Sequence, residues 1–387
     1  MTRLPYARHE IDEQDIAAVV EVLRSDWLTT GPQVESFERA IAEYAGCREA
    51  VAVNSGTAAL HCAMHALGIS SGDEVIVPAT TFAATANSVV YQGGRPVFAD
   101  VDPTTLQIDL HDLVRRITPR TRAVIAVDYA GAPCDYDALR EICDRYRLNL
   151  VADACHSLGG SYHGRPVGSL AELNCGSLHP VKPITSGEGG FVTTNVPYFA
   201  SRMRSFRNHG IDLDFRQREQ RVSWQYAMNE LGFNYRLNDI QCALAQSQLK
   251  KLAAWTARRN TLADYYRQRL AVAGVPAEPL RVPPNVVHAY HLFVVRWSPV
   301  QAGISRDQVF QSLRQNGIGV NVHYLPVYLH PYYQRQLRYR AGICPAAEAA
   351  AQEILSLPLF PAMRESDIDR VIEQLQQALN QTERKVG

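Results

Sequence analysis

The chain has 387 residues, of which 46% are hydrophobic and 20% charged, a composition typical of a soluble protein with one large and one smaller domain. Its 39 basic and 39 acidic residues balance, which removes any general electrostatic argument for nucleic acid or an anionic membrane as a partner. The eight cysteines form no C-x-x-C pair, so we expect reduced thiols and no zinc knuckle. The amino terminus lacks an apolar signal segment, and no apolar run reaches the length of a membrane span. The sequence therefore predicts a cytoplasmic protein.

Short apolar runs alternate with helical patterns through the first half of the chain. The helical patterns include TAALHCAMHALG and DYDALREICDRYR, whose apolar residues have helical spacing. This alternation predicts a parallel sheet covered by helices, and such sheets bind ligands at the carboxyl ends of their strands. The residues that directly follow each run are therefore the candidates for function. The expected strands are AVAV at 50–53, EVIVPA from 74, PVFADV from 96, AVIAV at 123–127, LNLVADA from 148 and GFVTT from 190.

A lysine stands between two prolines in SLHPVKPITSGEGG, residues 177–190. Most loop lysines are solvated surface charges. Here Pro180 and Pro183 stiffen the backbone around Lys182, which suits a side chain that needs a defined position. A lysine that sheds its proton can form a Schiff base with a carbonyl group. The segment therefore predicts covalent chemistry at Lys182, and a cofactor site formed by the rest of the chain.

Further residues that follow predicted strands fit such a site. In NSGTAAL, Gly56 permits a tight turn and Thr57 begins a helix whose amino end can bind phosphate; simple helix capping is the alternative. Asp153 follows LNLVA and can pair with a protonated ring nitrogen, or else hold a neighbouring loop. Phe82 can lie flat against a ring or belong to the core. Together with Lys182, these residues make up the parts of a pyridoxal phosphate (PLP) site.

Four motifs carry a resemblance to a known family. NSGTAAL, VADACHSLGG, SLHPVKPITSGEGG and GFNYRLNDIQCALAQSQLKKL occur in one order, and from YARHEIDEQDI to SLPLFPAM the chain resembles the sugar aminotransferases of the DegT/DnrJ/EryC1/StrS family. The resemblance implies a fold-type I PLP enzyme: an α/β large domain with a mostly parallel sheet flanked by helices, and a smaller carboxyl-terminal α+β domain. By the same resemblance, Lys182 is the Schiff-base lysine and Asp153 pairs with the pyridine nitrogen.

The resemblance also implies a homodimer with shared active sites, because one cofactor contact would come from the neighbouring subunit. The implied contacts are Gly56, Thr57 and Ser177 at the phosphate, Phe82 and His156 on the two sides of the ring, and Asn234 at the phosphate of the partner.

Substrates follow from the same resemblance. Within the family, Tyr6, SDWLTTGP, VDYAGAPCD and VNVHYLPVYLHPYYQ are most similar to the transaminases that aminate a UDP-4-keto-6-deoxy-N-acetylhexosamine in pseudaminic acid biosynthesis. Glutamate is the implied amino donor, and the two half-reactions imply ping-pong kinetics. Arg236 is expected to meet the nucleotide diphosphate from the partner subunit, or to form a surface salt bridge. His323 is expected at the sugar or in a structural role. The implied substrate contacts are Tyr6, Trp27, Leu28, Thr29, Ser55, Arg236, Asn321, His323 and Tyr324.

Other functions are open at this point. An aminotransferase for a dTDP-linked or 3-keto nucleotide sugar is one alternative to the UDP-sugar. A PLP sugar dehydratase of the same group usually has histidine in place of Lys182, and a regulatory, non-catalytic relative is expected to lose Lys182 or Asp153. His61 and His65 have metal-ligand spacing, but Cys62 stands where a metalloprotease needs glutamate, so we expect no metal.

The predicted boundary between the domains lies at a helix expected from residue 238 to about 255, with Asn238 and Gln241 as a capping box at its start. The carboxyl-terminal helix is expected to fray at its polar end. The predicted domains are residues 1–245, the large PLP-binding domain whose segment 1–30 lies near the small domain, and residues 246–387, the small domain.

Overall fold

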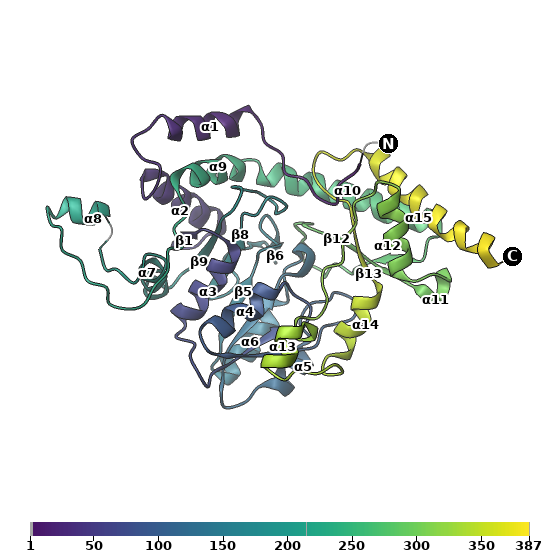
Figure 1. Ribbon diagram of the computed structural model, residues 1–387, viewed down its shortest axis with the longest axis horizontal. Helices are drawn as coiled ribbons and strands as arrows, with labels where there is room; N and C mark the ends of the chain where they lie inside the picture. Colours follow the sequence, from purple (N-terminus) through teal and green to yellow (C-terminus); the bar gives the residue numbers. More distant parts are fainter. Residues whose placement is uncertain (1–2, 214, 387) are drawn as a thin grey trace.

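The computed structural model describes residues 3–213 and 215–386. A seven-stranded sheet forms the larger part of the molecule and a three-stranded sheet the smaller part (Figure 1). The strands are β1 Glu49–Val53, β2 Glu74–Pro78, β3 Arg95–Ala99, β4 Thr121–Val127, β5 Asn149–Asp153, β6 Ser161–Tyr162, β7 Arg165–Pro166, β8 Leu173–Ser177, β9 Gly190–Thr194, β10 Ala277–Pro279, β11 Val286–Val287, β12 Phe293–Trp297 and β13 Ile354–Leu357.

Helices cover both of these sheets, and β11, β6 and β7 form a separate three-stranded sheet. The helices are α1 Glu13–Leu23, α2 Pro32–Ala45, α3 Gly56–Ala66, α4 Ala83–Tyr91, α5 Leu110–Arg116, α6 Tyr136–Tyr146, α7 Pro197–Phe206, α8 Phe215–Gln220, α9 Asp239–Leu249, α10 Leu252–Ala273, α11 Pro299–Ala302, α12 Arg306–Gln315, α13 Pro331–Gln336, α14 Pro345–Glu353 and α15 Glu365–Val386, with 3-10 helices η1 Tyr129–Gly131 and η2 Val327–Leu329.

The large sheet has the strand order β1-β9-β8-β5-β4-β2-β3. Only β9 runs antiparallel to its neighbours within this sheet, so the predicted mostly parallel sheet is confirmed. Each predicted run forms a strand, but β8 was missed because its sequence, LNCGS, is not an apolar run. Asn174 in that strand is buried, and its side chain bonds to the backbone of Ala171 and Thr193, which satisfies its polar atoms.

Alternate residues of the central strands face two separate helical layers. Val75 and Val77 of β2 pack into one apolar cluster with α3, α4 and α7. Ile76, between them, packs into a second cluster with α6 on the opposite face. A parallel sheet buried on both faces has the continuous apolar strands that the sequence shows. The result is a three-layer arrangement in which the carboxyl ends of the parallel strands share one edge.

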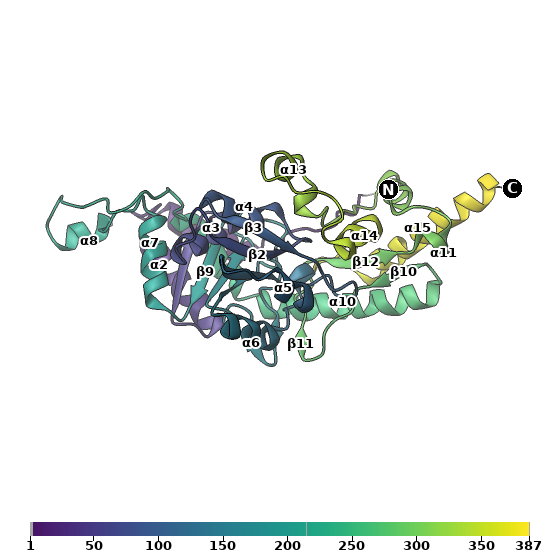
Figure 2. The same ribbon diagram turned by 90° about the horizontal axis from the view of Figure 1, so that it is seen from below.

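The smaller part is built on the antiparallel sheet β10-β12-β13, packed against α10, α12 and α15. Figure 2 shows α10 extending from the large part to this smaller one. Leu4 pairs with Ile318 in a short bridge and belongs to the small core, so the amino-terminal residues lie beside this part. Helix α1 packs instead on α9. In the described part of the chain, no helix is long and apolar enough to cross a bilayer.

The single helix expected from residue 238 to about 255 is a wrong prediction, because the structure has two helices there. Helix α9 ends at Leu249 and α10 begins at Leu252. The capping box is also only half formed: Asn238 accepts a hydrogen bond from the Gln241 amide at 2.9 Å, but the Gln241 side chain donates to the backbone of Glu188 instead. The division proposed between residues 245 and 246 falls inside α9 and stays a prediction.

An extended arm, residues 208–213 and 215–234, projects from the large part and carries α8 (Figure 1). Bridges between Asn208 and Asn234 and between Ile211 and Met228 close its base. Large apolar side chains are exposed along it, which is unusual for the surface of a monomer. They are Val222, Trp224, Tyr226, Met228, Leu231 and Phe233.

A buried carboxylate, Asp128, connects the loops that follow β4 and β5. It accepts hydrogen bonds from the Cys134 amide at 3.0 Å, the Tyr136 hydroxyl at 2.8 Å and the Ser157 hydroxyl at 2.5 Å. Burial raises the pKa of Asp128 to about 6, and the nearby charge of Asp153 adds to this effect. The group therefore holds its proton more tightly in the folded protein than in the unfolded chain.

We expect this carboxylate to make stability depend on pH. Because the pKa of Asp128 is raised to about 6 in the folded protein, its contribution to the free energy of unfolding is fully present below pH 4. That contribution, about 3 kcal/mol, is lost as the pH rises through 6. In Asp128→Asn the side chain cannot ionise. The free energy of unfolding of the variant should therefore rise relative to that of the wild type as the pH increases from 4 to 7. Urea unfolding of both proteins across this range measures the difference, and a difference that does not change with pH would contradict the assignment.

Candidate active site

One cavity of about 480 Å³ opens where the parallel strands end. The residues after β1, β2, β5 and β8 line its floor, as expected for a ligand site in this class of sheet. The structure thus brings together most of the predicted site residues. Those that line the cavity are Tyr6, Ser55, Gly56, Thr57, Phe82, Asp153, His156, Ser177, Lys182, Asn321, His323 and Tyr324.

Lys182 lies in the wall of the cavity on a tightly held loop. Its amide donates to the His179 carbonyl at 2.9 Å, and the hydroxyl of Thr185 donates to the Leu178 carbonyl at 2.9 Å. Burial lowers the pKa of Lys182, an effect that the nearby Cys155 and Asp153 partly oppose. A lowered pKa makes the neutral amine, the nucleophilic form, more accessible near neutral pH.

Asp153 ends β5 and is 5% exposed. Its Oδ2 accepts a hydrogen bond from the Thr85 hydroxyl at 2.6 Å, and Thr85 lies 2.7 Å from the hydroxyl of Thr81. Its Oδ1 accepts from the Cys155 amide at 3.3 Å. These bonds fix the orientation of the carboxylate, and a group held in this way can keep a proton on a ring nitrogen placed in the cavity.

The turn after β1 begins helix α3 at Gly56. Ser55 caps the helix by accepting from the Ala58 amide at 3.1 Å, while Gly56 and Thr57 face the cavity. A Cβ on Gly56 would lie 2.9 Å from Cβ of Ser177, so only glycine lets the turn approach that strand so closely. The first amides of a helix have no intrahelical partner, so the turn and Ser177 together form a suitable anion site.

Two aromatic groups and a histidine form one side of the cavity. Nε2 of His156 lies 3.2 Å from the Tyr324 hydroxyl, and the Tyr324 ring is 6.0 Å from that of Phe82. Burial is the main reason that the pKa of His156 falls well below its usual range, and the charge of Lys182 adds to it. The imidazole is therefore neutral, which suits packing against a ring. Phe82 is 57% exposed at the opening, where a ligand could cover it.

The smaller part of the molecule supplies further lining residues of the cavity. Nδ2 of Asn321 lies 3.2 Å from Nε2 of His323, whose Nδ1 is 2.8 Å from the Ser356 hydroxyl. The ring of Tyr6 lies 5.7 Å from that of His323. Burial lowers the pKa of His323 to about 4. These neutral polar groups can contact a sugar by hydrogen bonding, and His323 is also well satisfied structurally.

Five predicted contacts lie outside this cavity. Trp27, Leu28 and Thr29 lie on the loop before α2, and Asn234 is exposed at the base of the arm. Arg236 does not form the surface salt bridge that was one expectation, because it donates to Oδ1 of Asn208 at 2.8 Å. Arg236 and Thr30, next to Thr29, line a second cavity of about 440 Å³ at the base of the arm.

Among the residues that sequence reasoning did not assign to the site are Glu188 and His291, which line the cavity, and Thr85, which bonds to Asp153. Thr85, in the first turn of α4, orients Asp153, and only its spacing of four from Thr81, which precedes α4, could have indicated it. Glu188 lies in the SGEGG segment that follows the lysine, a motif we noted without assigning its carboxylate a role. His291 comes from a segment with no motif, HAYHLF, and reaches the cavity only through the tertiary fold.

The histidines with metal-ligand spacing have other partners. His61 lies 3.1 Å from the Tyr235 hydroxyl and 2.8 Å from the Gln92 amide, and His65 is 3.1 Å from a carboxylate oxygen of Glu230. Within the residues that the structure describes, no three histidine, cysteine or acidic side chains are grouped as a metal site would require.

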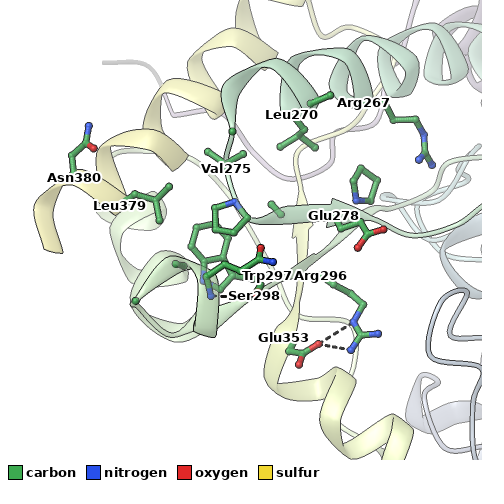
Figure 3. A pocket seen from close by; sticks show the side chains of 18 residues that line it. Arg267, Leu270, Val275, Glu278, Arg296, Trp297, Ser298, Glu353, Leu379 and Asn380 are labelled. Atoms are coloured by element: carbon green, nitrogen blue, oxygen red, sulfur yellow. Dashed lines mark hydrogen bonds and ion pairs between the residues drawn. The ribbon is translucent and has the colours of Figure 1, made fainter. Parts of the chain in front are cut away.

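A larger groove, of about 1460 Å³, lies in the smaller part between α10, β10 and α15. Figure 3 shows one pair of charged side chains in it: Arg296 donates to Glu353 at 3.0 Å. Arg267 donates to the Leu280 carbonyl at 3.1 Å. None of the residues predicted for the site lines this groove, so we place the chemistry in the cavity of Lys182.

Comparisons with known proteins identify the family of the chain. The sequence matches the DegT/DnrJ/EryC1/StrS aminotransferase family over residues 9–376. The chain belongs to this family.

Solved structures of similar proteins cover nearly the whole chain. Spr1654 from Streptococcus pneumoniae, in its PLP-form, is 30% identical with a TM-score of 0.90, covering 98% of this chain and 99% of that one. Helicobacter pylori PseC, an aminotransferase involved in pseudaminic acid biosynthesis, is 29% identical with a TM-score of 0.90, covering 98% and 100%. DesI, solved in the presence of its TDP-sugar product, is 30% identical with a TM-score of 0.89, covering 100% and 96%.

The chain is therefore a PLP-dependent sugar aminotransferase of the DegT/DnrJ/EryC1/StrS family, with the fold-type I architecture that the sequence predicts. The cavity fits PLP on grounds of its own. Nδ1 of His156 and Nδ1 of His291 are buried there without a protein partner among the described residues, so the cavity is built for a polar ligand. Because Gly56 has no side chain, the start of α3 packs directly against Ser177, so that the turn and the Ser177 hydroxyl line the same cavity.

We expect PLP to attach to Lys182 and to no other lysine. The chain has only four lysines, at positions 182, 250, 251 and 385. Borohydride reduction of the PLP-loaded protein, followed by peptide mass spectrometry, should place the label on Lys182, and Lys182→Ala should lose it. Lys250→Ala is the matched control and should keep the label. Label on Lys250, Lys251 or Lys385 in the wild type would overturn the assignment.

Proposed function

We propose that this protein transfers the amino group of glutamate to the 4-keto carbon of a UDP-4-keto-6-deoxy-N-acetylhexosamine of the pseudaminic acid type. The observation that supports it most is the convergence of Lys182, Asp153 and the Gly56 turn on one cavity that Tyr6 and Asn321 also line. The first three suit the cofactor, and the last two suit a sugar. The eight unpaired cysteines support a cytoplasmic location.

Lys182 is the residue that we propose moves the proton. When bound, PLP supplies a pyridinium ring that accepts the negative charge left by loss of the donor's α proton. The neutral amine of Lys182 would take that proton from the α carbon of the donor and pass it to the cofactor. In the second half-reaction the amine would move a proton in the opposite direction, from the cofactor to the sugar carbon that receives the nitrogen. Its buried position helps, because desolvation lowers the pKa of the amine.

Asp153 and its partners keep the ring nitrogen protonated. Hydrogen bonds from Thr85 and from the Cys155 amide fix the orientation of this carboxylate, which can then pair with a positive charge in the cavity. The amides of Gly56 and Thr57, with the Ser177 hydroxyl, would bind the phosphate.

The remaining cavity residues are proposed to flank and orient the ligands. His156 and Phe82 would lie on the two faces of the ring. Tyr6, Ser55 and Tyr324 would contact the sugar. The proposed sugar contacts also include Asn321 and His323, which line the same cavity.

The identity of the sugar rests on the resemblance to pseudaminic acid transaminases and on the similarity to PseC. The similarity to DesI, whose structure includes a TDP-sugar product, is as high, so a dTDP-linked sugar is the second candidate. Turnover with glutamate should be measured against UDP- and dTDP-linked 4-keto sugars and a 3-keto sugar, by formation of 2-oxoglutarate. We expect the UDP-4-keto-6-deoxy-N-acetylhexosamine to have a kcat/KM about tenfold or more above the others. A preference for a dTDP-sugar would overturn the proposed substrate but not the reaction.

We also propose a homodimer in which each active site uses Asn234 of the other subunit. The exposed apolar side chains of the arm support this, since burying such a surface favours association. Asn234 is exposed outside the cavity of its own chain, and Arg236 and Thr30 line the second cavity nearby. Among the described lining residues of the Lys182 cavity there is no arginine. A nucleotide diphosphate and a cofactor phosphate therefore need further hydrogen-bond donors. Asn234 and Arg236 of the partner subunit can supply them.

Mixing two inactive variants tests the shared site. In a heterodimer of Lys182→Ala and Asn234→Asp, both lesions fall in one site and the other site is intact. After complete subunit exchange, activity should recover to about a quarter of the wild-type value, because half of the dimers are mixed and each has one intact site. Exchange is verified with differently tagged chains. If exchange is complete and activity stays absent, Asn234 serves its own subunit.

A further inference from the structure

A short strap, residues 288–292 between β11 and β12, crosses from the smaller part to the wall of the active-site cavity. Its backbone is pinned to η1 at two points: the Ala289 amide donates to the Gly131 carbonyl at 2.9 Å, and the Leu292 amide donates to the Ala130 carbonyl at 3.1 Å. A Cβ on Gly131 would lie 3.1 Å from the His291 amide nitrogen, so glycine allows this close approach. The strap therefore holds His291 in a fixed position.

His291 points from the strap to the catalytic lysine. Its Nε2 lies 3.5 Å from Nζ of Lys182, and its ring centroid is 4.5 Å from that of His156. The residue is 5% exposed, and its Nδ1 is buried without a protein partner in the described chain. In the same part of the chain, His291 is the only side chain within hydrogen-bonding distance of the lysine amine.

We propose that His291 is a positioning residue for Lys182: its Nε2 accepts a hydrogen bond from the amine and thereby directs the amine's lone pair into the cavity. A neutral amine has two N–H groups and one lone pair. If Nε2 carried the proton and donated to that lone pair, Lys182 could not take a proton from the substrate. The Nδ1–H form of the imidazole avoids this and leaves Nε2 as the acceptor.

The surroundings keep His291 neutral. Burial is the main cause that holds the pKa of His291 well below its usual range, and the charge of Lys182 adds to it. A neutral imidazole can accept a hydrogen bond from Lys182 both before and after the lysine amine takes up a proton. When Lys182 becomes an ammonium, this bond stabilises it, because hydrogen bonds to charged groups are the stronger ones. The other titratable or charged groups that act on Lys182 or His291 are Asp153, Cys155 and His156 after β5, His323 of the smaller part and Arg259 of α10.

This inference rests on the proposed role of Lys182 as the proton carrier, but it does not depend on the identity of the sugar. The small number of lysines makes it testable residue by residue. The full-length protein is loaded with pyridoxamine phosphate, which leaves the Lys182 amine free. Trace labelling with acetic anhydride over a pH series, followed by peptide mass spectrometry, then gives the apparent pKa of Lys182 with Lys250, Lys251 and Lys385 as internal references.

The variants separate positioning from packing. His291→Phe removes the acceptor, and we expect the apparent pKa of Lys182 to fall by about one unit and kcat to fall about tenfold with little change in KM. His291→Gln places an amide oxygen near the position of Nε2 and should restore most of both values. His288→Phe is the matched control, because His288 lies in the same strap, bonds only within it and to α10, and does not line the cavity.

Two results would overturn the proposal: an apparent pKa of Lys182 that is unchanged or raised in His291→Phe, or an equal shift in His288→Phe. Failure of the wild-type protein to form a reducible link between PLP and Lys182 would instead overturn the proposed function. Because the labelling does not use turnover, the two failures can be told apart.

Discussion

Removing a lysine amine from water disfavours its charged form, and much of this molecule is arranged around that one constraint. Lys182 lies where the parallel strands end, on a loop held by prolines and by backbone hydrogen bonds. No carboxylate forms an ion pair with it among the described residues; the near neighbours are neutral histidines. An ion pair would have kept the amine protonated and unreactive. The protein instead keeps its carboxylate, Asp153, in the floor of the cavity and orients it with Thr85.

Close backbone approach is the second requirement. The turn at Gly56 reaches β8 because Gly56 has no side chain, and the strap reaches η1 because Gly131 has none. Each contact brings together segments far apart in the sequence: Gly56 with Ser177, and Gly131 with His291. The cavity is thus assembled from both parts of the molecule, and shifting one part relative to the other would separate Tyr6 and Asn321 from Lys182.

The charges of the site are divided between two places. Histidines and the carboxylates Asp153 and Glu188 line the cavity that holds Lys182, whereas Arg204, Arg207 and Arg236 line the second cavity at the base of the arm. In the proposed shared site, an anionic nucleotide sugar would contact both kinds of surface. The apolar arm beside the second cavity offers a physical reason for two chains to bring these surfaces together.

The sequence by itself determined six of the seven strands of the large sheet, the Lys182 loop, the turn at Gly56 and the position of Asp153, because apolar runs, prolines and glycines act through local backbone preferences. The sequence did not predict the break between α9 and α10. It also did not predict β8, because Asn174 and Gly176 are untypical of strands and are accommodated there only by tertiary contacts, such as the hydrogen bond from the Asn174 side chain to Thr193. Only the tertiary structure decided that Thr85 holds Asp153 and that His291 faces Lys182. These contacts join residues 68 and 109 positions apart, and no local pattern encodes a distance between such residues. They depend on how the two cores pack, which is a property of the whole chain.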